Sequence, residues 1–236
     1  MDPRPRILDT AFPRQCCSCG TEIGHPSENG LCWDCRSATH SLTPPWCDQC
    51  GMPIAGRVDH SFRCTRCEET RPAYTLARSL YRYEGGIRDA IHALKYHRDF
   101  SVIPDLARLF AAGILTHVPD AAAVQLVPVP LHSRKLRKRG FNQSHELAKA
   151  ICLLVPGAGI WPHLRRVKDT ETQTHLSASA RRRNVQGAFR AARTPAPESV
   201  ILIDDVMTTG STVDACARAL HQTGSRHITV LTLARG

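Results

Sequence analysis

Apolar and polar positions recur with two different periods along residues 74–236, and this predicts strands interleaved with helices. A partly alternating stretch at 74–83 predicts a strand, and glycines at its end precede a helix whose apolar residues lie within 87–94. A second helix is expected over 102–115. The apolar stretch 123–129 then predicts a buried strand that runs into a loop.

The C-terminal part continues this alternation. A helix is expected just after residue 143, and its apolar face consists of Leu147, Ile151, Leu154 and Val155. The run 165–189 is polar and without a strong period, so we interpret it as a largely mobile excursion that could close as a lid. Beyond it we expect a strand at 199–203, a helix from about residue 211 and a strand at 227–233. The buried stripe of that last helix consists of Val213, Cys216, Ala217 and Leu220. This order predicts an α/β fold with a mainly parallel sheet flanked by helices.

Residues 1–70 differ from the rest because they hold most of the cysteines. Nine of the eleven cysteines lie between positions 16 and 67, and eight of them form four C-x2-C pairs. The pairs are Cys16 and Cys19, Cys32 and Cys35, Cys47 and Cys50, and Cys64 and Cys67. The first and third pairs are each followed by glycine, so the segment repeats itself. We therefore expect a small N-terminal double zinc-ribbon domain over 1–70 and a larger domain over 71–236.

In this repeat each structural zinc ion would be held by two successive pairs. One alternative is cross-braced pairing, in which the first pair shares an ion with the third and the second with the fourth; the repeat disfavours it because pairs one and two form one repeat unit. The other alternative is dithiol redox chemistry, but a redox C-x2-C motif would be expected singly. Gly20 and Gly51 are expected to adopt positive φ beside the metal. Because eight cysteines already satisfy two ions, we interpret Cys17 as a spare thiol and His25 and His60 as solvated loop side chains.

Two sequence features that would indicate secretion or membrane insertion are not seen. No early stretch combines a basic end, a short apolar run and a small-residue cleavage site, and no apolar run approaches 20 residues. We therefore expect a cytoplasmic protein without membrane insertion. In that reducing compartment paired cysteines favour metal binding over disulfides.

The net charge of +10 is concentrated in one region. Residues 134–193 hold fourteen Lys or Arg against three Asp or Glu. Such a field attracts polyanions, either a small molecule bearing pyrophosphate or a nucleic acid. The alternative is a solvated helix face, although that would intersperse acidic residues. Aromatic residues in the region are only Phe141, Trp161 and Phe189, which disfavours recognition by base stacking.

The segment 200–212, VILIDDVMTTGST, carries the most specific chemical signal. Its apolar strand brings Asp204 and Asp205 to the carboxyl end, where open α/β sheets bind ligands. Residues 208–212 then offer hydroxyls, a permissive glycine and free amides at a helix start, which suits a phosphate. Because carboxylates accept hydrogen bonds from vicinal sugar hydroxyls, the segment predicts a cradle for a ribose phosphate.

This segment resembles the phosphoribosyl pyrophosphate (PRPP) motif of type I phosphoribosyltransferases. Over nearly the whole chain the sequence is similar to the ComF family, which includes ComFC-like and GntX-like proteins. The resemblance rests on the four cysteine pairs, LKYH at 94–97, PVPL at 128–131, RGFNQ at 139–143, and Arg166, Thr170, Gln173, Leu176, Arg181, Asn184 and the AF dipeptide at 188–189. It implies a type I phosphoribosyltransferase fold with an N-terminal double zinc ribbon.

The resemblance also implies roles for individual residues. Asp204 and Asp205 would hold the ribose hydroxyls, and Arg139 would act with them in catalysis. The 5-phosphate would lie on a phosphate loop made of Thr208, Thr209, Gly210, Ser211 and Thr212. A basic loop after the PVP segment, with Arg134, Arg137 and Arg139, would face pyrophosphate, and Gln143 and Arg181 would complete the binding residues.

The function implied is phosphoribosyl transfer from PRPP with magnesium to an acceptor that the sequence does not name. The family also implies a part in DNA uptake and natural transformation, with single-stranded DNA and a helicase-like partner. One alternative is a non-catalytic nucleic-acid-binding accessory protein that uses the fold for ligand sensing. Another is a zinc-ribbon adaptor with a vestigial transferase, which the intact acidic pair disfavours. Lys95 and Tyr96 either enter the site or form the polar end of a helix.

Overall fold

A parallel sheet forms the centre of the molecule. The structure, a computed structural model, describes residues 13–25, 28–118, 124–170, 178–192 and 195–236. Five strands pair in the order β1-β7-β6-β2-β3, and every pair is parallel. These strands are β1 (Leu76–Arg82), β2 (Gln125–Pro128), β3 (Gly159–Ile160), β6 (Ser199–Met207) and β7 (His227–Arg235). The α/β class and the mainly parallel sheet are thereby confirmed.

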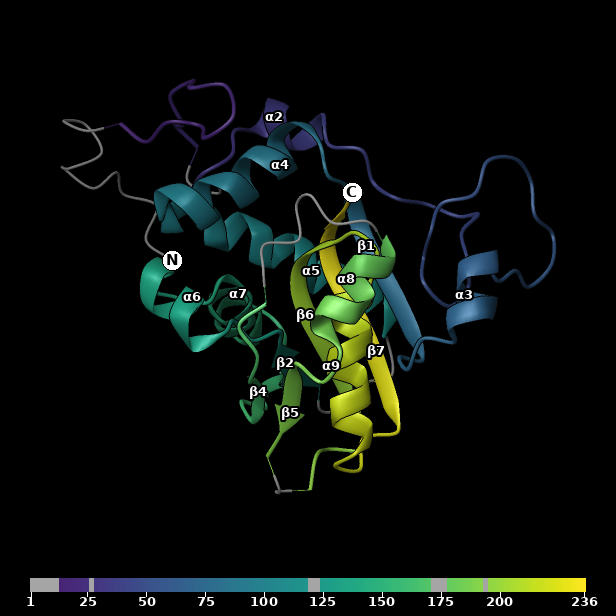
Figure 1. The fold of residues 1–236 in the computed structure, drawn as a ribbon. Helices are drawn as coiled ribbons and strands as arrows, with labels where there is room; N and C mark the ends of the chain where they lie inside the picture. Colours follow the sequence, from purple (N-terminus) through teal and green to yellow (C-terminus); the bar gives the residue numbers. More distant parts are fainter. Residues whose placement is uncertain (1–12, 26–27, 119–123, 171–177, 193–194) are drawn as a thin grey trace.

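Helices cover both faces of this sheet (Figure 1). One face carries α4 (Gly85–His92), which continues into a π-helical turn η1 (Ala93–His97), then a short 3-10 turn η2 (Phe100–Val102), α5 (Ile103–His117) and α7 (Gln143–Cys152). The other face carries α8 (Ala178–Val185) and α9 (Ser211–His221). Because successive strand residues point to opposite faces, Ile201 and Ile203 of β6 join the first core and Val200 and Leu202 join the second.

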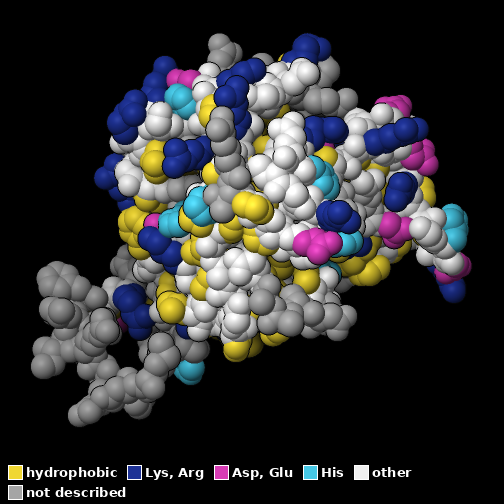
Figure 2. Space-filling model, turned by 90° about the horizontal axis from the view of Figure 1, so that it is seen from below, with side chains coloured by type: hydrophobic (Ala, Val, Ile, Leu, Met, Phe, Trp, Pro, Cys, Tyr) yellow, Lys and Arg dark blue, Asp and Glu magenta, His cyan; other side chains and the backbone are white. Residues whose placement is uncertain are grey.

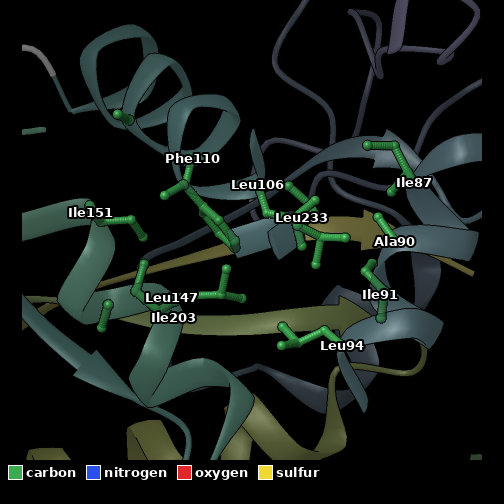
Figure 3. Close-up of a cluster of buried hydrophobic side chains, with 14 of the residues drawn as sticks. Ile87, Ala90, Ile91, Leu94, Leu106, Phe110, Leu147, Ile151, Ile203 and Leu233 are labelled. Carbon is green, nitrogen blue, oxygen red and sulfur yellow. The ribbon is translucent and has the colours of Figure 1, made fainter. Parts of the chain in front are cut away.

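Figure 3 shows how the first of these cores is filled. Apolar side chains of α4, η1, α5 and α7 converge on β6 and β7, and the labelled residues come from these six elements. On the opposite face the predicted stripe of α9 is buried at all four positions, Val213, Cys216, Ala217 and Leu220. The stripe predicted on α7 is only partly correct, because the helix ends at Cys152 and Leu154 is 45% exposed.

The basic segment after the PVP turn is a helix, not the loop that was expected. Helix α6 spans Ser133–Arg139. Its residues are mostly Arg, Lys and Leu, which are good helix formers. His132 caps its start by accepting from the Arg134 amide, and Gly140 ends it at φ 88°. The cationic side chains are therefore distributed around a rigid cylinder, and only one side of it can face any given ligand.

The excursion 165–189 is also more ordered than expected. Within its described part, strand β4 (Leu164–Arg166) pairs antiparallel with β5 (Phe189–Ala191), and α8 lies between them in sequence. Leu164, Val185 and Phe189 are buried. Residues 171–177, which include Gln173 and Leu176 of the family pattern, lie outside the described residues, as does Ala123 at the start of the third predicted apolar stretch.

The cysteine-rich segment is packed against the sheet and its helices rather than standing apart. Its two short helices are α2 (Trp33–Ser37), which lies beside α4, and α3 (Thr65–Thr70), which lies beyond the edge strand β1 (Figure 1). Leu31 belongs to the same core as α4 and α5. Among the described residues no helix is both long and apolar enough to cross a membrane.

Candidate functional site

Eight cysteines form two separate clusters, each built from two successive pairs. Sulfur atoms of Cys16, Cys19, Cys32 and Cys35 lie within 4.8 Å of one another, and those of Cys47, Cys50, Cys64 and Cys67 do the same. The sequential pairing is confirmed, and the cross-braced alternative is wrong. Four thiolates in tetrahedral reach are the usual ligands of structural zinc, so both clusters fit that ion.

Local backbone geometry holds the sulfurs in place. Gly20 and Gly51 have φ of 75° and 66°, as the repeat predicts. The amide of Cys32 donates to the Cys16 sulfur at 3.4 Å, and the amide of Cys64 donates to the Cys47 sulfur at 3.3 Å. Backbone amides that donate to a metal-binding sulfur in this way hold the thiolate in the orientation that the metal needs.

Three other candidates lie outside the two clusters, namely Cys17, His25 and His60. Burial, with the nearby Cys16 thiol, raises the pKa of Cys17 to about 12. Cys17 therefore stays protonated at neutral pH, in agreement with its interpretation as a spare thiol.

The acidic pair lies at the carboxyl end of the sheet, two residues before the end of β6. Ser144, fully buried at the start of α7, donates its hydroxyl hydrogen to Asp204 Oδ1 at 3.0 Å. The backbone amides of Asp205 and Val206 donate to Asp204 Oδ1 and Asp205 Oδ1 at 3.0 and 2.8 Å. Both carboxylates are thereby fixed in orientation by donors within the chain.

Lys95 enters this site from the opposite side. Its ammonium forms an ion pair with Asp205 Oδ2, and both side chains are largely buried. Burial opposes the charge on Lys95, but the Asp205 carboxylate outweighs it and raises the pKa of Lys95. The π-helical turn η1 carries this residue, and such turns often occur at functional sites. Of the two readings of Lys95, entry into the site is correct.

The pKa of Asp204 is shifted from its ordinary value. Withdrawal from water and the neighbouring Asp205 charge raise the pKa of Asp204 to about 7, although Lys95 and the Ser144 hydrogen bond oppose the shift. Asp204 therefore changes charge near neutral pH, and it accepts hydrogen bonds with both oxygens only above that pH.

Helix α6 presents one pair of cations to the acidic pair. Arg139 donates to Gln143 Oε1 at 2.5 Å and lies 5.9 Å from the centre of the Tyr96 ring. Lys135 stands one turn earlier on the same side of the helix. Partial burial and the neighbouring charges of Arg139 and Arg166 lower the pKa of Lys135, while Asp205 opposes the shift. Sequence reasoning missed Lys135, although its i, i+4 spacing from Arg139 could have indicated it.

The other predicted cations do not join this group. Arg134 pairs with Asp169 at 3.0 Å, so it links α6 to the segment after β4. Arg137 is exposed on α6. The side chain of Arg181 lies outside the described residues, although its backbone belongs to α8. The helical geometry of α6 thus separates Arg139 from Arg134 and Arg137, which the sequence had grouped.

Arg166 supplies a further cation from β4. Its guanidinium contacts the hydroxyl of Thr170 and lies 5.4 Å from the centre of the Phe189 ring. Burial lowers the pKa of Arg166, and the charge of Asp204 opposes that shift. Its buried Nε has no hydrogen-bond partner among the described residues. The family pattern had included Arg166 without giving it a role.

The phosphate loop has the form expected of an anion cradle. Gly210 has φ of 74° and caps α9, and a Cβ there would lie 2.7 Å from Met207 Cε. The hydroxyls of Thr209 and Ser211 lie 2.9 Å apart. Thr208 is exposed, and Thr212 lies in the first turn of α9. The Ser211 amide donates to the Thr209 hydroxyl at 3.4 Å, so this helix start is partly capped by the loop itself.

The basic excess is not spread as one field over the whole surface. Figure 2 views the side of the amino ends of the strands, and Lys and Arg there are scattered among acidic, His and apolar side chains. The carboxyl side instead gathers Lys95, Lys135, Arg139 and Arg166 around the acidic pair.

Fold and site together define an α/β protein with two zinc-type centres and an acidic site lined by cations. The family model described as "Double zinc ribbon domain" matches residues 7–68. The chain is 34% identical over 213 residues to "DNA utilization protein YhgH" of Salmonella typhimurium, covering 87% of this chain and 90% of that protein. It is 31% identical over 234 residues to "Competence protein F" of Haemophilus influenzae, covering 95% and 98%. "Competence protein ComFC" of Bacillus subtilis is 30% identical over 218 residues, covering 87% and 84%. The chain belongs to the ComF family of competence and DNA utilization proteins.

A solved structure of a hypoxanthine phosphoribosyltransferase from Staphylococcus aureus superposes on part of the chain. The TM-score is 0.35 at 12% identity, covering 56% of this chain and 62% of that one.

Proposed function

We propose that the protein binds PRPP at the carboxyl end of its sheet and uses that site in DNA uptake and natural transformation. The observation that carries this proposal is the arrangement of Asp204 and Asp205 beside a glycine-capped helix start. Two oriented carboxylates suit vicinal ribose hydroxyls, and the helix start suits a phosphate about one sugar away. The names of the relatives motivate the biological role.

The cations suit the remaining part of PRPP. Pyrophosphate carries several negative charges, and Lys95, Lys135 and Arg139 come from two elements on either side of the acidic pair. In the transfer, an acceptor lone pair would bond to the anomeric carbon while the carbon–oxygen bond to pyrophosphate breaks. The departing oxygen would keep the electron pair, and these cations would stabilise that charge.

Magnesium fits this site chiefly through the substrate. Asp205 is already paired with Lys95, which leaves Asp204 as the carboxylate with spare acceptor capacity in the pair. Mg²⁺ commonly keeps several waters and binds mainly through substrate oxygens, so one nearby carboxylate is sufficient. When bound, the ion would neutralise pyrophosphate charge in addition to the protein cations.

Calorimetry with PRPP and magnesium tests the binding. The wild type is expected to bind, and an Asp204→Ala, Asp205→Ala variant to lose most of the affinity. An equal affinity of that variant, or no heat of binding with the wild type, would refute the proposal. Pyrophosphate release measured by mass spectrometry with a panel of metabolites and nucleotides then separates phosphoribosyl transfer from binding without turnover.

A non-catalytic role in handling single-stranded DNA is the second candidate. It is favoured by exposed cations on α6 that do not face the acidic pair, such as Arg137 and Lys138. If these residues contact phosphates, affinity for a single strand should fall steeply with salt. An Arg137→Ala, Lys138→Ala variant should show a shallower salt slope, and a flat slope in the wild type would exclude this role.

A further inference from the structure

A cavity of about 570 Å³ lies along the outer side of α9, between α3 of the second zinc ribbon and the segment from α8 to β5. It meets the phosphate loop at Thr209, Gly210 and Ser211, but neither Asp204 nor Asp205 lines it. Its size is within the range of small-molecule sites, roughly 300–1,000 Å³. It is therefore a hollow distinct from the acidic site, and the two share only the loop between them.

The charged lining of this cavity is mainly cationic. Four arginines reach it from four different elements, namely Arg66, Arg183, Arg190 and Arg218. The one carboxylate among its described lining residues is Asp214, whose oxygens accept from Arg218 Nε at 3.1 Å and from the Ala73 amide at 2.7 Å. Since that carboxylate is already engaged, the remaining charge favours an anionic ligand.

A tyrosine also contributes to the cavity. Tyr74 is 2% exposed and lines it. A tyrosine hydroxyl beside a cavity can donate a hydrogen bond to a bound molecule. Burial raises the pKa of Tyr74, so the group is a donor that suits an acceptor oxygen or nitrogen on a ligand.

Arg66 and this hydroxyl converge on the same place. Measured from the point that a Cβ at Gly210 would occupy, the Tyr74 hydroxyl lies at 3.5 Å and Arg66 Nη2 at 3.7 Å. A guanidinium and a phenol beside a helix start form a donor set for phosphate oxygens. The side chains of Val185, Phe189 and Ala219 are buried along the same cavity and offer an apolar wall.

The second metal centre positions Arg66. This residue lies between the ligands Cys64 and Cys67, in the helix α3 that begins directly after Cys64. Loss of the ion from that cluster would release α3 and withdraw Arg66 from the cavity. The second ribbon is thus part of a ligand site as well as a structural element.

We propose that this cavity binds a nucleoside phosphate, either free or as one unit of a single strand. Arg66 and the Tyr74 hydroxyl bind the phosphate, and the apolar wall accommodates the base or sugar. The acidic pair takes no part in this site, which shares only the phosphate loop with the proposed PRPP site.

The test uses the full-length zinc-loaded protein with two probes, deoxyadenosine 5′-monophosphate and a twelve-residue oligothymidylate with a 5′-hydroxyl. Arg66→Ala is expected to weaken binding roughly tenfold or more, and Tyr74→Phe several-fold, since each removes a hydrogen bond to a charged group. Arg63→Ala is the matched control, because it removes the same charge from the same ribbon at an exposed position outside the cavity. It should change the affinity less than twofold. Zinc content and circular dichroism verify that each variant is folded.

The two probes distinguish the sources of the phosphate. Binding of the mononucleotide identifies a free nucleotide, and binding of the oligonucleotide alone identifies a strand; either supports the proposal if Arg66 is required. The proposal is overturned if neither probe binds, or if Arg63→Ala weakens binding as much as Arg66→Ala does. An Asp204→Asn variant should retain the probe, so a failure of PRPP binding does not decide this outcome.

Discussion

At the scale of single residues, the acidic pair is controlled by two neighbours far away in sequence. Ser144 donates to Asp204, and Lys95 neutralises Asp205. Both favour the charged form of the pair, against burial and mutual repulsion, which raise the pKa of Asp204 to about 7. The charge state of the site is therefore balanced near neutral pH, and small changes at Ser144 or Lys95 should move it.

Replacing Ser144 with alanine should shift the pH dependence of PRPP binding. Affinity is expected to rise with pH through about 7 as Asp204 becomes an acceptor. The variant loses a hydrogen bond to the carboxylate, so its midpoint should move upward by roughly half a unit to one unit. Calorimetry between pH 5.5 and 8.5 measures this midpoint. Ser37→Ala, which changes an exposed serine, is the control. An unchanged midpoint would show that Ser144 has no such influence.

Replacing Lys95 with methionine should destabilise the fold, and more so at high pH. Without Lys95, the pKa of the acidic pair in the folded protein lies above its pKa in the unfolded chain. The folded state therefore binds more protons, and stability falls as pH rises from about 4 through the folded-state pKa. Breaking a buried ion pair costs about 3 kcal/mol when both carboxylates are charged. Denaturant unfolding at pH 5 and pH 8 checks this prediction, with Lys95→Arg as the charge-preserving control. A deficit equal at both pH values would contradict it.

At the scale of elements, each ribbon is attached to the rest of the fold through its own backbone. The buried Asp105 of α5 accepts from the amides of Gly30 and Leu31 at 2.8 and 3.1 Å, which fixes the first ribbon. In the second, the Arg235 side chain donates to the Cys50 carbonyl at 2.8 Å. A Cβ on Gly51 would lie 2.6 Å from the Ala77 carbonyl oxygen, so the ribbon lies directly on β1.

Substitution of Asp105 by alanine should loosen the first ribbon. The substitution leaves buried amides without an acceptor, which lowers the free energy of unfolding by about 3 kcal/mol. For a chain of this size, each kcal/mol of lost stability lowers Tm by roughly 2–4 °C. Scanning calorimetry measures the shift, and Asp59→Ala, which removes an exposed carboxylate paired with Arg57, should change Tm by less than one degree. Equal shifts in the two variants would argue against the docking role of Asp105.

At the scale of the whole molecule, the ribbons and the sheet share hydrophobic cores. Cys16, Ile23 and Leu31 pack with the core under α4 and α5, and Cys47 and Cys50 pack with the core under α9. A boundary at residue 70 remains a prediction about folding units. What the packing indicates is that metal binding and the stability of the sheet are coupled.

Removal of both zinc ions should therefore lower the stability of the sheet, not only that of the ribbons. Metal analysis is expected to give two zinc ions per chain, one for each cluster. After chelation under reducing conditions, the thermal transition followed by far-ultraviolet circular dichroism should shift down by ten degrees or more, on the order of several kcal/mol. A sheet transition unchanged by chelation would show that the ribbons fold independently.

Local pattern alone determined much of this protein. The periodicity of apolar residues predicted the parallel α/β order and the α9 stripe, because burial imposes a period of two on strands and 3.6 on helices. The cysteine repeat predicted which pairs share a metal, because two successive C-x2-C pairs are close in sequence and can bring their sulfurs together. The segment at 200–212 predicted an acidic pair followed by a glycine-capped helix start for the same reason, since all its parts are contiguous.

Only the tertiary structure decided which distant side chains meet. Ser144 carries no sequence signal for contact with the acidic pair, and the sequence left open whether Lys95 enters the site, because these residues approach it from α7 and η1. The separation of Arg139 from Arg134 depends on the helical winding of α6, which a count of basic residues does not contain. Likewise, Arg66 meets Tyr74 and the phosphate loop only because the second ribbon docks on the sheet edge. Contacts between elements depend on the packing of whole faces, and that is set by the entire fold rather than by any one segment.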